Sequence, residues 1–219
     1  MRSDQPAPRE PVLNAPWPPL LLCLTLLALY AAQSAWGGFA AIEAHALIPV
    51  RVITGEWGGL ATHLFLHGGW AHVLLNTAGL LAFGTAVARL LGLGVRGGAA
   101  FLAFYLACGV LAGAAFVALN PVGETPVVGA SGAVAGLMAG ASRLIERPGR
   151  LSGWRSPPVI GMGAAWLVIN IAAAVLGTLP GAGGASIAWE AHLAGYAAGL
   201  LLIAPAWRLS GSRDAVISR

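Results

Sequence analysis

The feature that most constrains this chain is a series of long apolar stretches, several of them longer than 18 residues. Such runs are typical of membrane-spanning helices, because about 20 residues at ~1.5 Å per residue cross a hydrocarbon core of ~30 Å. The fourth stretch, bounded by Pro126 and a loop from Arg143 to Arg155, is the shortest. We predict an all-α membrane protein with six transmembrane helices, at 20–40, 71–91, 99–119, 128–144, 158–178 and 187–207.

The composition supports this prediction. Charged residues make up 9% of the chain and hydrophobic residues 58%, whereas an ordinary soluble domain carries about 25% charged residues. A soluble globular enzyme and a disordered chain are both excluded. The net charge of +4 would suggest nucleic-acid binding in a soluble protein, but here membrane topology explains it, and we expect no nucleic-acid partner.

The arginines predict the orientation. With six spans, all but Arg51 fall on one side of the membrane, and positive residues stay cytoplasmic. We therefore expect both termini in the cytoplasm and a long outer loop at 41–70. The arginine-only, alanine- and glycine-rich composition suggests a bacterial cytoplasmic (inner) membrane. A cleaved signal peptide ending near Ala35 is the alternative; it would remove one span and leave the other orientations unchanged. The eleven arginines on the inner side are Arg2, Arg9, Arg89, Arg96, Arg143, Arg147, Arg150, Arg155, Arg208, Arg213 and Arg219.

The expected domains follow from these boundaries. Residues 1–19 hold six of the 14 prolines and no periodicity, which predicts a disordered cytoplasmic tail. Residues 20–207 form the membrane domain, and 208–219 a cytoplasmic C-terminal tail. Cys23 and Cys108 lie within apolar runs, where we expect small buried side chains rather than a disulfide.

Unusual polar residues cluster at one depth. In this topology spans two, four and six run from outside to inside, and each carries polar side chains near its outer end. Polar residues inside a membrane are costly and usually functional. The residues are His72 and Asn76, Ser131, and His192.

Ser131 follows a turn and lies in the first turn of its helix, where free backbone N–H groups favour a developing negative charge. Strips of small residues let membrane helices approach closely, which would bring His192 within hydrogen-bonding range as a general base. Ser131 as a packing residue is the alternative. Glu190 lies about 200° round the helix from His192, so we expect a dyad without an acidic third member. The helix-packing glycines are Gly132 and Gly136 on span four, and Gly195 and Gly199 on span six.

His72 and Asn76 are four residues apart and share a helix face. Both donate hydrogen bonds, so they are candidates to hold the oxyanion of a tetrahedral intermediate together with the Ser131 N–H. Hydrogen bonding between helices is the alternative function for such residues.

These motifs resemble those of the rhomboid intramembrane serine proteases. The matching runs are His-Gly-Gly-Trp-Ala-His-Val-Leu-Leu-Asn at 67–76, Gly-Ala-Ser-Gly at 129–132 and Ala-His-Leu-Ala-Gly at 191–195, within roughly 40–205. The resemblance implies a six-helix fold around a water-filled cavity open to the outside. It also implies Ser131 as nucleophile, His192 as base, and His72 and Asn76 at the oxyanion site. The partners would be the lipid bilayer and transmembrane protein substrates cut near their outer ends, with no metal or cofactor.

The chain departs from the family at two places. Many members carry an aromatic residue four positions after the serine, stacked on the catalytic histidine, whereas this chain has Ala135. Tyr196 or Trp189 are candidate substitutes.

The outer loop is the second departure. Well-known members carry a Trp-Arg pair there, whereas here Gly58 follows Trp57 and Arg51 is the only outer arginine. We interpret His63 and His67 as residues that position this loop.

Other functions fit less well. No H-E-x-x-H motif occurs, which argues against a metalloprotease, and the only aspartates, Asp4 and Asp214, lie in the tails, which excludes aspartyl proteolysis. A small transporter should show an internal repeat, which is absent. The main alternative is a catalytically silent rhomboid-like module that binds transmembrane helices. Inactive relatives generally lose the serine or the histidine, and this chain keeps both.

Overall fold

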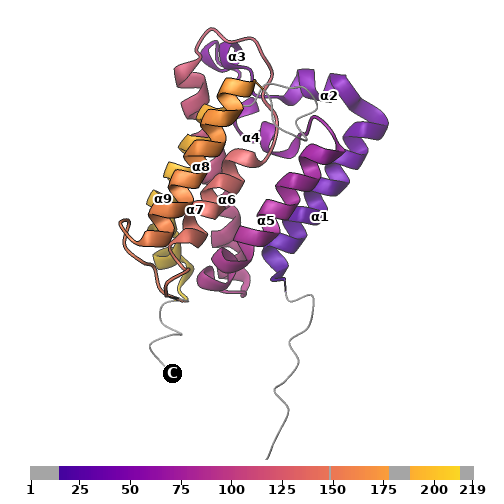
Figure 1. Ribbon diagram of the computed structural model, residues 1–219. Helices are drawn as coiled ribbons and strands as arrows, with labels where there is room; N and C mark the ends of the chain where they lie inside the picture. Colours follow the sequence, from indigo (N-terminus) through magenta and orange to yellow (C-terminus); the bar gives the residue numbers. More distant parts are fainter. Residues whose placement is uncertain (1–14, 148, 178–187, 213–219) are drawn as a thin grey trace, which may run out of the picture.

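The computed structural model describes residues 15–147, 149–177 and 188–212, and this part of the chain is helical, with no strand. Figure 1 shows the helices as one bundle, with short helices at one end. The predicted all-α class is confirmed. The elements are α1 (Trp17–Ala32), η1 (Gln33–Gly37), α2 (Gly38–His45), α3 (Pro49–Ile53), α4 (Gly59–Thr62), η2 (His63–Phe65), α5 (Trp70–Leu91), α6 (Val95–Leu119), α7 (Ser131–Ser142), α8 (Pro157–Leu176) and α9 (Trp189–Ser210).

Within the described residues, five helices are long and apolar enough to cross a membrane, and they match five of the six predicted spans. Helices α1, η1 and α2 form one of them as a continuous run. It begins at Trp17, three residues before the predicted span, because Pro18 and Pro19 are tolerated in a first helical turn. Residues 1–14 and 213–219 of the predicted tails lie outside the described residues. The five spans are Trp17–His45, Trp70–Leu91, Val95–Leu119, Pro157–Leu176 and Trp189–Ser210.

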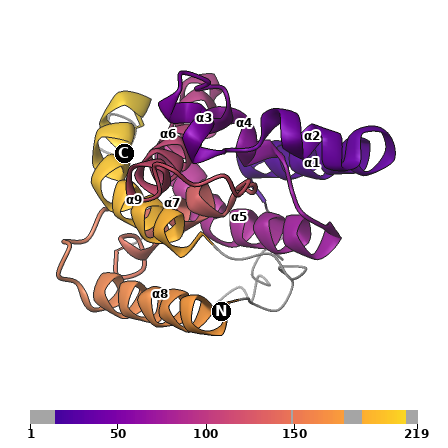
Figure 2. The same ribbon diagram turned by 90° about the horizontal axis from the view of Figure 1, so that it is seen from above.

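The fourth predicted span, 128–144, is a shorter helix than expected. Helix α7 has 12 residues, which is about 18 Å of helix, and ten of its residues are buried. It lies in the middle of the bundle in contact with α5, α6, α8 and α9 (Figure 2). Hydropathy does not distinguish residues that face protein from residues that face lipid, so the sequence could not show this difference.

Helices α7 and α9 pack backbone against backbone. A Cβ atom added to Gly195 would overlap the carbonyl oxygen of Gly132, and one added to Gly199 would overlap that of Gly136. The two glycine strips therefore face each other. This close approach brings the N-terminal ends of α7 and α9 together, and Ser131 and His192 lie at these ends.

The outer loop folds as three short elements, α3, α4 and η2. Its Leu47 exchanges two backbone hydrogen bonds with Val127, of 3.0 and 2.9 Å, which ties the loop to the segment that leads into α7. Arg51 Nη1 donates to the carbonyl oxygen of Glu43 over 2.7 Å, and Trp57 is exposed. In this chain backbone hydrogen bonds and the Arg51 side chain hold the loop.

Helix α8 lies at the edge of the bundle (Figure 2). Only Val159, Asn170 and Ala173 among its residues are buried. Most of its other large apolar side chains are exposed, as suits a helix that faces lipid, whereas Met162 and Trp166 are half-buried against the bundle. The exposed side chains include Ile160, Leu167, Val168, Ile169, Ile171 and Val175.

Candidate active site

The structure brings the predicted Ser131 and His192 together. Ser131 is the first residue of α7, and His192 lies in the first turn of α9. Ser131 Oγ lies 2.8 Å from His192 Nε2, which is hydrogen-bonding distance. A hydroxyl in contact with an imidazole is the pairing that nucleophilic catalysis by serine requires.

The start of α7 leaves the backbone N–H of Ser131 without a hydrogen bond inside the helix. The first hydrogen bond of α7 runs from Val134 N–H to the Ala130 carbonyl oxygen, so the Ser131 N–H has no partner within the helix. Gly129, two residues before Ser131, has φ 121°, a conformation that favours glycine. Its N–H donates to the His63 carbonyl oxygen over 2.9 Å. The turn thus places Ser131 at the N-terminus of α7.

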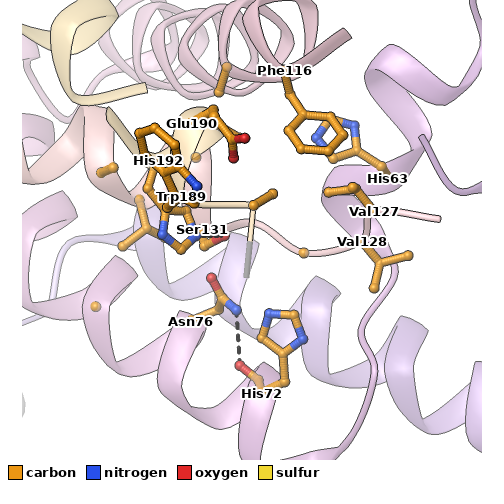
Figure 3. Close-up of a pocket in the computed structure, with 18 of the residues that line it drawn as sticks. His63, His72, Asn76, Phe116, Val127, Val128, Ser131, Trp189, Glu190 and His192 are labelled. Atoms are coloured by element: carbon orange, nitrogen blue, oxygen red, sulfur yellow. Dashed lines mark hydrogen bonds between the residues drawn. The ribbon is translucent and has the colours of Figure 1, made fainter. Parts of the chain in front are cut away.

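His72 and Asn76 face the same turn from α5 (Figure 3). A Cβ atom on Gly129 would lie 2.7 Å from His72 Nε2 and 3.9 Å from Asn76 Nδ2. Asn76 Nδ2 donates one hydrogen to the His72 carbonyl oxygen over 2.9 Å, and its second hydrogen remains available. Both predicted oxyanion donors therefore lie next to Gly129, which is two residues before Ser131.

The loop that precedes α5 orients the His72 ring. Gln33 Nε2 donates to the His67 carbonyl oxygen over 2.8 Å, and Gln33 Oε1 accepts from the His67 N–H over 3.2 Å. The next residue, Gly68, donates its N–H to His72 Nδ1 over 3.3 Å. Since Nδ1 accepts this bond, neutral His72 carries its proton on Nε2, toward Gly129.

His63 and His67 lie at the end of the outer loop, where the sequence analysis predicted residues that position this loop. The His63 ring donates from Nδ1 to the Gly59 carbonyl oxygen over 2.8 Å, and burial lowers the pKa of His63 to about 4. His67 is fully buried and makes edge-on ring contacts with Tyr30 and His72. Within the described residues, no group of three or more His, Cys, Asp or Glu side chains is placed to hold a metal ion.

One cavity of about 640 Å³ is lined by His63, His72, Asn76, Ser131 and His192. Its remaining wall is largely apolar, and Glu190 also lines it, with no hydrogen bond to His192 in the described structure. A pocket of this size with few convergent polar groups is typical of a site for an extended or small organic ligand. The large apolar residues of the wall are Leu75, Phe83, Phe116, Met138, Trp166 and Trp189.

Two residues of α8 that the sequence analysis missed contact His192. The Trp166 ring lies 5.5 Å from the His192 ring, centroid to centroid, and its Nε1–H donates to the His192 carbonyl oxygen over 3.4 Å. Asn170 Oδ1 lies 2.9 Å from His192 Nδ1. A signal was present, since Trp166 and Asn170 are the only side chains of α8 that form strong hydrogen bonds.

The two aromatic substitutes that the sequence suggested are wrong. Tyr196 donates its hydroxyl to the Val159 carbonyl oxygen over 3.3 Å and packs beside Ala135 and Met138. The aromatic ring in contact with His192 is that of Trp166, and Trp189 lines the cavity without such a ring contact. The aromatic partner thus comes from α8 instead of α7 or α9.

Comparison with known proteins agrees with this architecture. The family model described as the Rhomboid domain matches residues 54–209, so the chain belongs to the rhomboid family. Members of this family are in general intramembrane proteases that act on transmembrane substrates.

Two proteins of Bacillus subtilis (strain 168) are similar to part of the chain. The Rhomboid protease GluP is 38% identical over 87 residues, which cover 40% of this chain and 16% of GluP. The Putative rhomboid protease YdcA is 35% identical over 86 residues, which cover 39% of this chain and 40% of YdcA. The matches thus cover less than half of each curated relative.

Proposed function

We propose that this protein is an intramembrane serine endopeptidase that uses Ser131 and His192 as a catalytic pair. The observation that carries the proposal is the 2.8 Å contact between Ser131 Oγ and His192 Nε2 at the wall of a cavity. The Ser131 N–H has no partner within its helix, and the donors on His72 and Asn76 lie next to Gly129, two residues earlier; together these groups would supply an oxyanion site.

The mechanism follows from these positions. Ser131 attacks a substrate carbonyl carbon while His192 Nε2 takes the hydroxyl proton, and the same proton then passes to the leaving amine. The Ser131 N–H, His72 Nε2–H and the Asn76 amide stabilise the oxyanion. Water then hydrolyses the acyl-enzyme with His192 again as base.

We infer the substrate class from the family. We infer the orientation in the membrane from the distribution of arginines. The substrates are transmembrane proteins, cut near the outer face of a bacterial cytoplasmic membrane, with both termini of the enzyme in the cytoplasm. The large apolar side chains of the cavity wall suit a peptide segment that comes from a hydrophobic helix.

A fluorophosphonate probe tests the proposal directly. Such probes react with a serine whose hydroxyl is activated by a base, so we expect the purified parent protein to be labelled and Ser131→Ala to remain unlabelled. If the parent protein is not labelled and does not cut any transmembrane reporter, the catalytically silent helix-binding module is the correct function.

Asn76→Ala should lower kcat on a transmembrane reporter by about 10-fold, the low end of the ~10- to 1000-fold range for an oxyanion donor. The effect should be small because His72 and the Ser131 N–H remain. KM should change little, since the donor acts on charge that develops in the transition state. Leu74→Ala, an exposed position on the same helix, is the control. A change in KM alone would contradict the oxyanion assignment.

A further inference from the structure

Asn170 is an unusual residue for its helix. Its side chain is 1% exposed on a helix that otherwise presents mostly apolar groups to the outside. A buried amide without partners is costly, yet this one is satisfied on both sides. Its Nδ2 donates to the Trp166 carbonyl oxygen over 2.8 Å, and its Oδ1 lies 2.9 Å from His192 Nδ1.

These two contacts determine where the protons lie. A carbonyl oxygen only accepts, so the amide group of Asn170 that faces Trp166 is its NH₂, and the atom that faces His192 is its oxygen. An amide oxygen also only accepts, so His192 Nδ1 must carry a hydrogen. Neutral His192 therefore has a lone pair on Nε2, the nitrogen that lies beside Ser131 Oγ.

We propose that Asn170 is a positioning residue that makes the pair a Ser131–His192–Asn170 triad. The inference rests on the proposed proteolytic function. Asn170 selects the imidazole tautomer whose Nε2 accepts the serine proton, and it fixes the plane of the ring. When His192 becomes an imidazolium during the reaction, Nδ1–H keeps the same acceptor.

Trp166 also fixes the position of the His192 ring. Its indole packs against the imidazole with an interplanar angle of 37°, and its N–H reaches the His192 carbonyl oxygen. Trp166 and Asn170 are four residues apart and so lie on one face of α8. The face of α8 that meets α9 therefore holds both the plane and the tautomer of the base.

Three variants test the proposal. Asn170→Leu keeps the approximate shape and removes the acceptor, whereas Asn170→Asp keeps an oxygen in place of Oδ1. Val159→Ala is the matched control, because it loosens a buried position on the same helix without touching His192. For each we would measure kcat and KM on a transmembrane reporter, the rate of fluorophosphonate labelling, and the Tm.

We expect Asn170→Leu to lose about 10- to 100-fold in kcat and in labelling rate, with KM within about twofold. Asn170→Asp should recover at least tenfold over Asn170→Leu, and Val159→Ala should match the parent. In ¹⁵N-histidine NMR, with the His192 signals identified by their loss in His192→Gln, Asn170→Leu should lower the Nδ1–H population.

The outcomes separate this proposal from the proposed function. If the parent protein is labelled and Asn170→Leu is labelled and cuts at the same rate, only the triad is wrong. A loss that Val159→Ala reproduces, or that Asn170→Asp does not relieve, would mean that Asn170 acts through packing and would overturn the proposal. An unlabelled and inactive parent would instead overturn the proposed function.

Discussion

Ser131→Ala is expected to abolish proteolysis while the protein remains folded. The variant removes the hydroxyl that lies 2.8 Å from His192 Nε2. Thr125 also lines the cavity, but among the described residues the hydroxyl that contacts this nitrogen is that of Ser131. Loss of the nucleophile in serine proteases lowers kcat by a factor on the order of 10⁶, so cleavage should fall below detection. The measurement is cleavage of a transmembrane reporter in reconstituted liposomes, with Tm as the test of folding.

Ser142→Ala is the matched control for this experiment. Ser142 lies on the same helix, is fully buried and donates to the Ala139 carbonyl oxygen within that helix. Its loss should leave cleavage unchanged. His192→Ala should resemble Ser131→Ala, because the serine then lacks its base. Cleavage retained by Ser131→Ala would end the assignment of Ser131 as the nucleophile.

Gly195→Val is expected to cause the largest loss of stability. Even a single Cβ at this position would overlap the Gly132 carbonyl oxygen, and a backbone group cannot move aside as a flexible side chain can. Overpacking in a core costs about 1–3 kcal/mol, and we expect the upper end or more. Because the α7–α9 contact also brings Ser131 to His192, activity should be lost together with Tm.

Gly161→Val provides the comparison for this glycine. Gly161 lies within α8, and a Cβ there would meet no atom within 4 Å, so the same substitution should change Tm little. Thermal unfolding in detergent measures both variants. Equal Tm values for Gly195→Val and the parent would show that α7 and α9 do not require close contact.

The sequence predicted the central part of the site because its signals are local. Ser131 and His192 are polar residues in apolar helices, and glycines at three- and four-residue spacing beside them mark faces that pack closely. The structure places these faces against each other. The length of α7 could not be predicted, since burial by other helices and contact with lipid give the same apolar composition.

The contribution of α8 was missed for a different reason. Whether Trp166 and Asn170 reach His192 depends on how α8 is rotated about its own axis next to α9, and an almost uniformly apolar helix carries little periodicity that would predict rotation. The search for an aromatic partner was therefore limited to residues near His192 in sequence. The search for a third member was limited to carboxylates, although a neutral amide oxygen also accepts from Nδ1–H.

Because α8 lies at the edge of the bundle, its position affects the order of substrate entry and cleavage. This helix is anchored by few buried side chains, and one of them is Asn170. If α8 moves outward to admit a substrate helix, His192 loses its contacts with both Asn170 and Trp166 in the same movement. Substrate entry and peptide-bond cleavage would then occur in separate steps. A substrate that prevents α8 from returning would remain bound without being cleaved.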